Sequence, residues 1–412
     1  MQWNALLAVQ MDSNPFMRHE YLAALHQSGA AIPQTGWTPR FVTLWRDTHL
    51  VAACPLYIKA HSYGEYVFDW AWANAYQQHG LSYYPKAVVA VPFTPVPGPR
   101  LLARNPADRK ALIQALITWC ADQKLSSMHL LFINDDDIEA TTSADLMPRH
   151  TVQFHWRNAY PAVDDEVSVL PPGKANFSGG GQSLPESSDA KNCHSSDRKF
   201  TSFDEFLASL SQEKRKKIRQ ERRKVEDAGV SFRWSLGSNI NPADWDFFYR
   251  CYERTYLEHG NAPYLSRDFF QRMADSMPEN WLLFVAEQKG TPIATSLIAL
   301  RSGSMWANGQ NDSKVAYGRY WGALQRVDCL HFEACYYQPL QWCIEHGYAR
   351  FEGGAQGEHK MARALMPVKT SSAHWLAHPA FSDAVGNFLE REGQGINNYM
   401  GDLSQRSPFR QI

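Results

Sequence analysis

Residues 349–360 read Ala-Arg-Phe-Glu-Gly-Gly-Ala-Gln-Gly-Glu-His-Lys. The first four residues predict a short strand, which runs into a glycine-rich loop and then into Glu358, His359 and Lys360. Upstream, residues 331–346 predict a helix that feeds this strand. A helix, a strand, a glycine loop and ionisable side chains are how α/β proteins build sites at the carboxyl end of a strand. The alternative is a plain glycine turn followed by a solvated charged tail.

Size and charge limit the possible classes of protein. The 412 residues correspond to two or three domains at roughly 100–200 residues each. The formal net charge is −1, so no overall field attracts nucleic acid or membrane, and any such attraction must be local.

The seven cysteines include no C-x-x-C pair, which disfavours a disulfide framework or a zinc site. We expect reduced thiols and a cytoplasmic protein, with no metal bound. The first 14 residues lack the features of a secretory signal, and no run of about 18 apolar residues is present. Peripheral contact with a membrane surface remains open, whereas a transmembrane segment is not expected.

The chain contains a pattern-level internal repeat. Two predicted hairpins correspond, at 40–57 and 281–300, and each half closes with a helix, a strand and a polar loop. Between them, residues 163–199 are rich in Pro, Gly, Ser and Asp and predict a flexible linker or insertion. We therefore expect mixed α/β domains at 1–162 and 200–412, with a ligand cleft between them.

The first half supplies one candidate wall for this cleft. Residues 58–85 hold a dense polar and aromatic set, within which residues 66–72 predict a strand. Core packing explains many of the rings, but explains His61 and Glu65 less well. We expect His61, Glu65 and Tyr66 to contact substrate.

A strongly basic helix is predicted over residues 211–227. Its charges surround the helix at about 100° per residue, which is compatible with a simple solvated helix. The functional alternative is a surface for the phosphates of a donor or a tRNA, with Arg215, Arg219 and Arg222 as candidates.

Several longer strings carry a family resemblance. They are NPF at 14–16, GW-x-PR at 36–40, PLY-x-K-x-HS-x-GEYVFD at 55–69, VPFTPV-x-GPRLL at 91–102, HFEACYYQ at 331–338 and E-x-G-AQGEHK at 352–360. Together they resemble a bacterial family of predicted N-acyltransferases that is related to the Fem-type aminoacyl transferases of peptidoglycan synthesis, within the GNAT-like superfamily.

The resemblance implies two tandem GNAT-like acyltransferase domains with a central cleft. It implies transfer of an acyl or aminoacyl group to an amine acceptor, a cell-wall precursor or a lipid. Aminoacyl-tRNA, acyl-carrier protein or acyl-CoA is then a co-substrate, and no tightly bound cofactor is expected. Residues 320–327 do not match the pyrophosphate loop of GNAT acetyltransferases, Q/R-x-x-G-x-G/A, which disfavours acetyl-CoA held in the usual way.

The expected mechanism assigns roles to residues near the glycine-rich loop that follows residues 349–352. Glu358 or His359 takes a proton from the attacking amine, and Glu333 orients that amine. Lys360 holds a phosphate or carboxylate, as does Arg319. The remaining substrate-binding candidates are Tyr320, Trp321, Gly353 and Gly354, the two glycines through backbone N–H groups that face the developing oxyanion.

Two other functions fit the same residues. A fatty-acyl N-acyltransferase acting on a lipid amine would use the aromatic region near residues 70–84 as an acyl groove. A non-catalytic peptidoglycan-recognition protein would keep the fold without the chemistry.

Overall fold

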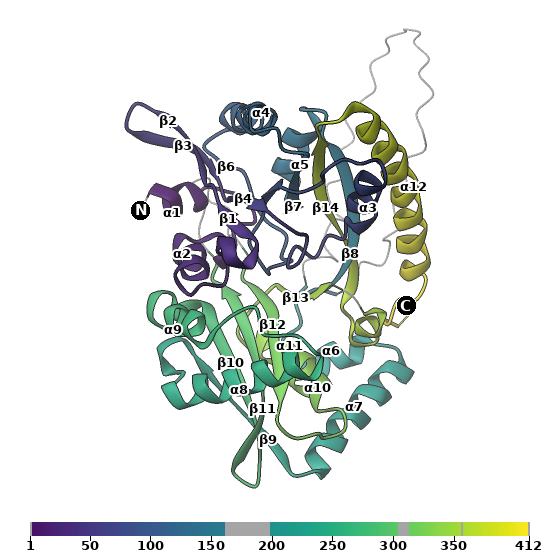
Figure 1. Ribbon diagram of the computed structural model, residues 1–412. Coiled ribbons are helices and arrows are strands. Elements are labelled where there is room, and N and C mark those ends of the chain that lie inside the picture. Colours follow the sequence, from purple (N-terminus) through teal and green to yellow (C-terminus); the bar gives the residue numbers. More distant parts are fainter. Residues whose placement is uncertain (1, 161–197, 304–312, 356, 411–412) are drawn as a thin grey trace, which may run out of the picture.

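The computed structural model describes residues 2–160, 198–303, 313–355 and 357–410 (Figure 1). Residues 2–160 are called the first half below, and residues from 198 onward the second half. The predicted linker at 163–199 lies outside the described residues up to position 197, and the domain limits at 162 and 200 stay a prediction.

One mixed sheet of eleven strands runs through both halves. Its order is β1 (Trp37–Pro39), β4 (Leu56–Lys59), β5 (Lys86–Val89), β7 (Ser127–Ile133), β14 (Met366–Leu376), β8 (Met147–Arg157), β13 (Arg350–Ala355), β12 (Val315–Ala323), β11 (Thr291–Arg301), β10 (Trp281–Gln288) and β9 (Val230–Leu236).

The two halves exchange one strand each at the centre of this sheet. Strand β8 belongs to the first half but pairs with β13, and β14 belongs to the second half but pairs with β7. The two exchanged strands also pair with each other, antiparallel, over nine residue pairs from Met147↔His374 to His155↔Met366. The halves are therefore joined by continuous backbone hydrogen bonding.

The same pairing pattern occurs on both sides of the exchange. β4, β5, β7 and β14 are joined by antiparallel, parallel and antiparallel pairings, and β11, β12, β13 and β8 repeat that series. This agreement supports the repeat that the sequence indicates.

The predicted hairpin of the first half forms, but it divides between two sheets. The strands next to its turn, β2 (Val42–Arg46) and β3 (His49–Cys54), join β6 (Leu102–Ala103) in a three-stranded sheet. Its last residues belong to β4, which pairs with β1 in the eleven-stranded sheet. The amide of Arg40 donates to the carbonyl of Leu56 at 2.7 Å where the hairpin passes from one sheet to the other.

Helices cover the sheet in both halves (Figure 1). Their bounds are α1 (Gln2–Leu7), α2 (His19–Gln27), α3 (Trp70–Gln78), α4 (Pro106–Asp122), α5 (Asp135–Thr142), α6 (Phe203–Ser209), α7 (Gln212–Asp227), α8 (Pro242–Glu258), α9 (Arg267–Ser276), α10 (Leu330–Phe332), α11 (Gln338–Glu345) and α12 (Pro379–Ser404). A π-helical turn, Glu333–Tyr337, joins α10 to α11. Within the described chain, every helix is too short or too polar to span a lipid bilayer.

Local sequence signals explain several helix starts and one wrong prediction. The side chains of Asn105, Asn134 and Asn241 each accept the amide three residues ahead, as N-caps do. Residues 66–72, however, are not a strand. Tyr66 has φ of 59°, which is outside the extended region, and α3 begins at Trp70.

Aromatic side chains pack the halves together. The ring of Phe16 meets that of Tyr317 at 5.4 Å between centroids, and the ring of Tyr21 meets Phe269 at the same distance. In the opposite direction, Trp156 of β8 is fully buried within the core of the second half, 6.0 Å from the ring of Phe206. The two halves thus share apolar cores as well as a sheet.

Replacing Trp156 with alanine is expected to lower the free energy of unfolding by about 3–5 kcal/mol, because it empties a buried aromatic site. Urea denaturation followed by circular dichroism measures the loss. Trp45 is 54% exposed on β2 and gives a matched control, for which a change within about 0.5 kcal/mol is expected. Equal losses for both variants would show that β8 adds no core packing to the second half.

Candidate active site

The centre of the candidate site is a gap between two parallel strands. β12 and β13 pair only from Val315↔Arg350 to Tyr317↔Glu352, although both strands continue beyond these residues. Past that point no pairing joins them in the described residues. Gly318 and Gly353 stand at the mouth of the gap, directly after the last paired residues of the two parallel strands, and both line a cavity there.

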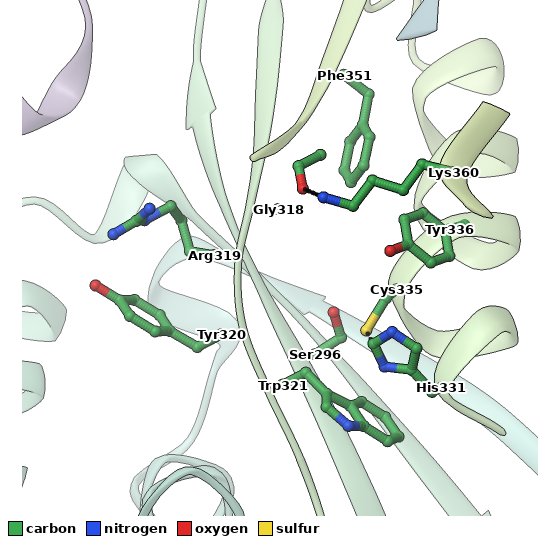
Figure 2. Close-up of a pocket in the computed structure, with 11 residues that line it drawn as sticks. Ser296, Gly318, Arg319, Tyr320, Trp321, His331, Cys335, Tyr336, Phe351 and Lys360 are labelled. Atoms are coloured by element: carbon green, nitrogen blue, oxygen red, sulfur yellow. Dashed lines mark hydrogen bonds between the residues drawn. The ribbon is translucent and has the colours of Figure 1, made fainter. Parts of the chain in front are cut away.

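A β-bulge at Arg319 directs side chains to one side of β12. Leu297 pairs with Tyr320 and Ile298 with Gly318, so Arg319 is the additional residue on β12. Figure 2 shows Arg319 and Tyr320 on one side of this strand, and Ser296, Trp321 and the residues of the α10 segment on the other. Two cavities lie on these two sides.

The first cavity, called the helix pocket, has a volume of about 150 Å³ and lies between β12 and the π-helical turn (Figure 2). All of its lining residues belong to the second half. They are Ser296, Gly318, Arg319, Tyr320, Trp321, His331, Cys335, Tyr336, Phe351, Gly353 and Lys360.

The second cavity, called the boundary pocket, has a volume of about 230 Å³ and is lined by both halves. The first half contributes Tyr66, Phe93 and Pro95, and the second half contributes Tyr252, Tyr256, Tyr264, Leu265, Gly318, Arg319, Tyr320, Gly353 and Gly354. Aromatic rings dominate this lining. A hydrogen bond of 3.0 Å from the guanidinium of Arg319 to the carbonyl of Phe93 joins the halves here.

The two pockets meet at the gap. Gly318, Arg319, Tyr320 and Gly353 line both of them. Space at this point is limited, because a methyl group added to Gly318 would lie 2.9 Å from the ring of Phe351. A methyl group added to Gly353 would likewise lie 2.4 Å from the side chain of Leu365, so the structure requires glycine-sized residues at both positions.

Lys360 lines the helix pocket. It is 6% exposed, and its ammonium donates to the carbonyl oxygens of Gly353 at 2.6 Å and Gly354 at 3.3 Å. Burial lowers the pKa of Lys360 to about 8. The positive charge consequently stands beside the gap and is held by backbone dipoles.

The expectation that Glu358, His359 and Lys360 line one cavity is wrong for the first two. They lie on a 3-10 helix, Glu358–Arg363, in which successive side chains point about 120° apart. Glu358 is exposed and accepts hydrogen bonds from Tyr399 at 2.8 Å and Arg406 at 2.9 Å, both on the C-terminal segment. His359 is also exposed and, like Glu358, lines neither pocket.

Glu333 also lies outside both pockets. It is 4% exposed in the π-helical turn, where Arg222 of α7 binds its carboxylate at 3.0 Å and Gln338 donates to it at 2.7 Å. Arg222 is therefore engaged with protein. Arg215 is half-buried with a long 3.5 Å contact to the carbonyl of Ala208, whereas Arg219 is exposed.

Of the three residues predicted in the first half, the structure brings Tyr66 alone to the boundary pocket. Glu65 is buried beside Lys86, at 2.8 Å from its ammonium, and burial raises the pKa of Glu65 to about 7. His61 is half-buried, accepts the amide of Tyr63 at 3.3 Å, and lines neither pocket. Glu65 and His61 therefore contact other residues of the first half and are not part of the pocket lining.

Several lining residues were not predicted from the sequence. Tyr252 and Tyr256 have the i, i+4 spacing of an ordinary core-facing helix, so no signal separated them from packing. His331 and Cys335 show the same spacing inside a helix that the sequence does predict. Among the described residues, no group of three or more His, Cys, Asp or Glu side chains is placed to hold a metal ion.

The chain is similar to a known protein family and to several solved structures. The model of the FemAB-like family, described as peptidoglycan biosynthesis/recognition, matches residues 1–171 and 186–411. No curated protein matches the chain. Among solved structures, FemX is similar over 93% of this chain and 98% of its own, at 9% identity and a TM-score of 0.50.

Two further solved structures are similar at lower scores. L-PGS from Bacillus licheniformis covers 91% of this chain and 98% of its own at 12% identity, with a TM-score of 0.47. A tandem GNAT protein from the clavulanic acid biosynthesis pathway covers 92% and 94% at 10% identity, with a TM-score of 0.41. At these identities the likeness concerns the fold alone. The expected mixed α/β fold with two similar halves is confirmed.

Replacing Glu333 with alanine is expected to lower the free energy of unfolding by about 1–3 kcal/mol, because Arg222 and Gln338 lose a buried partner. Glu358→Ala is the matched control. Its ion pair with Arg406 is exposed, so a loss of about 0–1 kcal/mol is expected. Urea denaturation measures both. A larger loss for Glu358→Ala than for Glu333→Ala would contradict this assignment.

Proposed function

We propose, from the premise that the chain belongs to the FemAB-like family of peptidoglycan biosynthesis and recognition proteins, that it is an N-acyltransferase. It moves an acyl or aminoacyl group from an activated ester or thioester to an amine on a cell-wall precursor. The observation that carries this proposal is the meeting of two pockets at the gap between β12 and β13. Two substrates that enter from opposite sides come into contact there, as group transfer requires.

The helix pocket is the proposed donor side. The donors considered (aminoacyl-tRNA, acyl-carrier protein and acyl-CoA) all carry phosphate. The basic helix α7 packs against the π-helical turn that lines this pocket, and the pair between Arg222 and Glu333 joins the two elements. Exposed Lys216, Arg219 and Arg223 on α7 then offer positive charge to those phosphates outside the pocket.

The boundary pocket is the proposed acceptor side. The rings of Tyr66, Tyr252, Tyr256 and Tyr264 suit the apolar faces of sugar or peptide units. The guanidinium of Arg319 suits a carboxylate or phosphate of the same molecule. Since this pocket needs both halves, the acceptor is recognised at their boundary.

The chemistry needs a charge partner and a proton acceptor. When the amine attacks the donor carbonyl, negative charge develops on its oxygen, and the Lys360 ammonium is the group placed to stabilise that charge. The amine must also lose a proton. Because Glu358 and His359 lie outside the pocket, we assign proton transfer to His331. Burial lowers the pKa of His331 to about 4, so its imidazole is neutral at pH 7.

Identification of the donor is the direct test of this function. The protein is purified and analysed for bound coenzyme A, acyl-carrier protein or tRNA, and each donor class is then combined with a peptidoglycan precursor or an aminolipid. Mass spectrometry of the acceptor reports amide formation. The activated donors named are cytoplasmic, so the proposal locates the reaction there. Binding of a precursor without turnover by any donor class would instead establish a recognition protein.

A fatty-acyl transferase acting on a lipid amine is the alternative within the same test. The helix pocket is small and is lined by His331, Cys335, Tyr336 and Lys360, which favours a short or polar acyl group over a long alkyl chain. Transfer to aminolipids, but not to the precursor, would favour the alternative.

The transfer rate is expected to fall as the pH rises through about 8, because Lys360 loses its proton near that pH. Lys360→Met should lower kcat by about 10²–10³-fold at neutral pH. In Lys360→Arg, which keeps its charge, the falling limb should disappear from the range between about pH 6 and pH 10. The measurement is kcat against pH for the three proteins. A wild-type rate that stays constant or rises through pH 8 would contradict this role for Lys360.

Substituting Lys216, Arg219 and Arg223 together with alanine is expected to weaken donor binding and to reduce its dependence on salt, by about one unit of slope per lost phosphate contact. The dissociation constant for aminoacyl-tRNA, acyl-carrier protein or coenzyme A is measured from low to high salt. Lys110, Lys369 and Arg391, which are exposed elsewhere, form a control triple with the same charge change. Equal effects of the two triples would exclude a specific role for α7.

A further inference from the structure

One side chain of the helix pocket, the thiol of Cys335, has no role in direct transfer from donor to amine. His331 and Cys335 lie one helical turn apart and face each other, with 3.4 Å between the Cys335 sulfur and Nδ1 of His331. Both side chains line the helix pocket together with Ser296 and Lys360 (Figure 2). The pocket thus contains a thiol, a proton acceptor and a cation.

The backbone around the thiol is also unusual. Cys335 and Tyr336 lie in the π-helical turn, Glu333–Tyr337, where one extra residue widens the helix. Single π-turns of this kind are found mostly at functional sites. Here the turn faces the pocket with Cys335 and Tyr336, while Glu333 is directed to α7.

The environment of Cys335 differs from that of four other cysteines in the described residues, whereas Cys329 is half-buried like Cys335. Cys54, Cys120, Cys251 and Cys343 are buried in apolar cores. Burial raises the pKa of the Cys335 thiol to about 12 and lowers the pKa of His331 to about 4. Both side chains are therefore uncharged at neutral pH, and these shifts disfavour a resting thiolate–imidazolium pair. The thiol is activated only by giving its proton to the adjacent Nδ1 of His331 as the sulfur attacks the donor.

We propose that Cys335 is the nucleophile that carries the acyl group between the two pockets as a thioester. The inference rests on the proposed function and adds a covalent intermediate to it. The Cys335 sulfur lines the helix pocket, whose wall at Gly318 and Gly353 is shared with the boundary pocket, so an acyl group on sulfur can be reached from the acceptor side.

Two displacements make up the reaction. In the first, Nδ1 of His331 takes the thiol proton, sulfur bonds to the donor carbonyl carbon, and the donor C–O or C–S bond breaks. The leaving alcohol or thiol takes the proton from the imidazolium. In the second, the acceptor nitrogen bonds to the thioester carbon, the C–S bond breaks, and the amine proton returns through His331 to the sulfur. The products are an amide and the free donor carrier, and the enzyme is unchanged.

Trapping the thioester tests the inference. The wild-type protein is mixed with a small aminoacyl thioester of N-acetylcysteamine, or with acetyl-CoA, in the absence of any acceptor amine. Intact-mass spectrometry should show one acyl adduct that hydroxylamine removes, and peptide mapping should locate it at Cys335. With the natural donor and acceptor, initial rates should follow ping-pong kinetics.

Variants distinguish a chemical role from a structural one. Cys335→Ser keeps the shape of the side chain but replaces the thiol with a much weaker nucleophile, and it should form no adduct and lose transfer by at least about 100-fold. His331→Gln should form the adduct more slowly while keeping the same melting temperature. Cys343→Ala, which removes a thiol from the same helical segment outside the pocket, should still be acylated at Cys335.

Three results would overturn the inference. They are transfer by Cys335→Ser within about threefold of wild type, transfer by the wild type without any adduct, and an adduct at a residue other than Cys335. In each case the proposed N-acyltransferase function remains, without a thioester at Cys335. If the wild type transfers no acyl group from any donor class to any acceptor, the proposed function itself fails, and the inference fails with it.

Discussion

The antiparallel pairing of β8 with β14 is the constraint on which the rest of this structure depends. Each strand completes the sheet of the other half, so neither half has its full set of strands alone. Because β8 pairs with β14, the sheet is continuous from β1 to β9. The two parallel pairs, β5 with β7 and β12 with β13, are thereby placed on either side of the same central ribbon.

Only the second of these parallel pairs opens into a usable gap. In the first half, Gly98 pairs again with Ile133 beyond the end of β5, and the intervening loop reaches toward the second half through Phe93 and Pro95. In the second half, β12 and β13 separate after Tyr317 and Glu352. The repeat therefore supplies one pair that builds the site and one that helps to line it.

The sequence predicts well those features that depend on local periodicity. The helix and strand leading to Glu352, the basic helix and the two hairpins follow from residue spacing and turn signals. A site at the glycines at 353 and 354 stays a prediction, and the structure shows cavities beside both residues. The exchange of β8 and β14 could not be predicted, because partner choice between strands 200 residues apart leaves no local pattern. The prediction of a strand at 66–72 was wrong. Its aromatic residues are compatible with a strand or a loop, and the left-handed conformation of Tyr66 excludes the strand.

Adjacency in sequence also misled the prediction of the site. Glu358, His359 and Lys360 are consecutive, but the 3-10 helix points them in three directions, and only Lys360 reaches the pocket. The sequence suggests that the carboxylate of Glu333 is free to orient a substrate, because Glu333 begins a helical segment. In the structure that carboxylate forms an ion pair with Arg222 of α7. Which partner a charged side chain finds depends on tertiary packing, and so does the choice between His359 and His331.

The unequal origin of the two pockets has a consequence for how this chain varies. Because the helix pocket is built from the second half alone, while Tyr66, Phe93 and Pro95 reach the boundary pocket from the first half, substitutions in the first half can alter one pocket and leave the other intact. Under the proposed assignment of the pockets, acceptor preference can accordingly diverge among descendants of this chain while the donor chemistry is inherited unchanged.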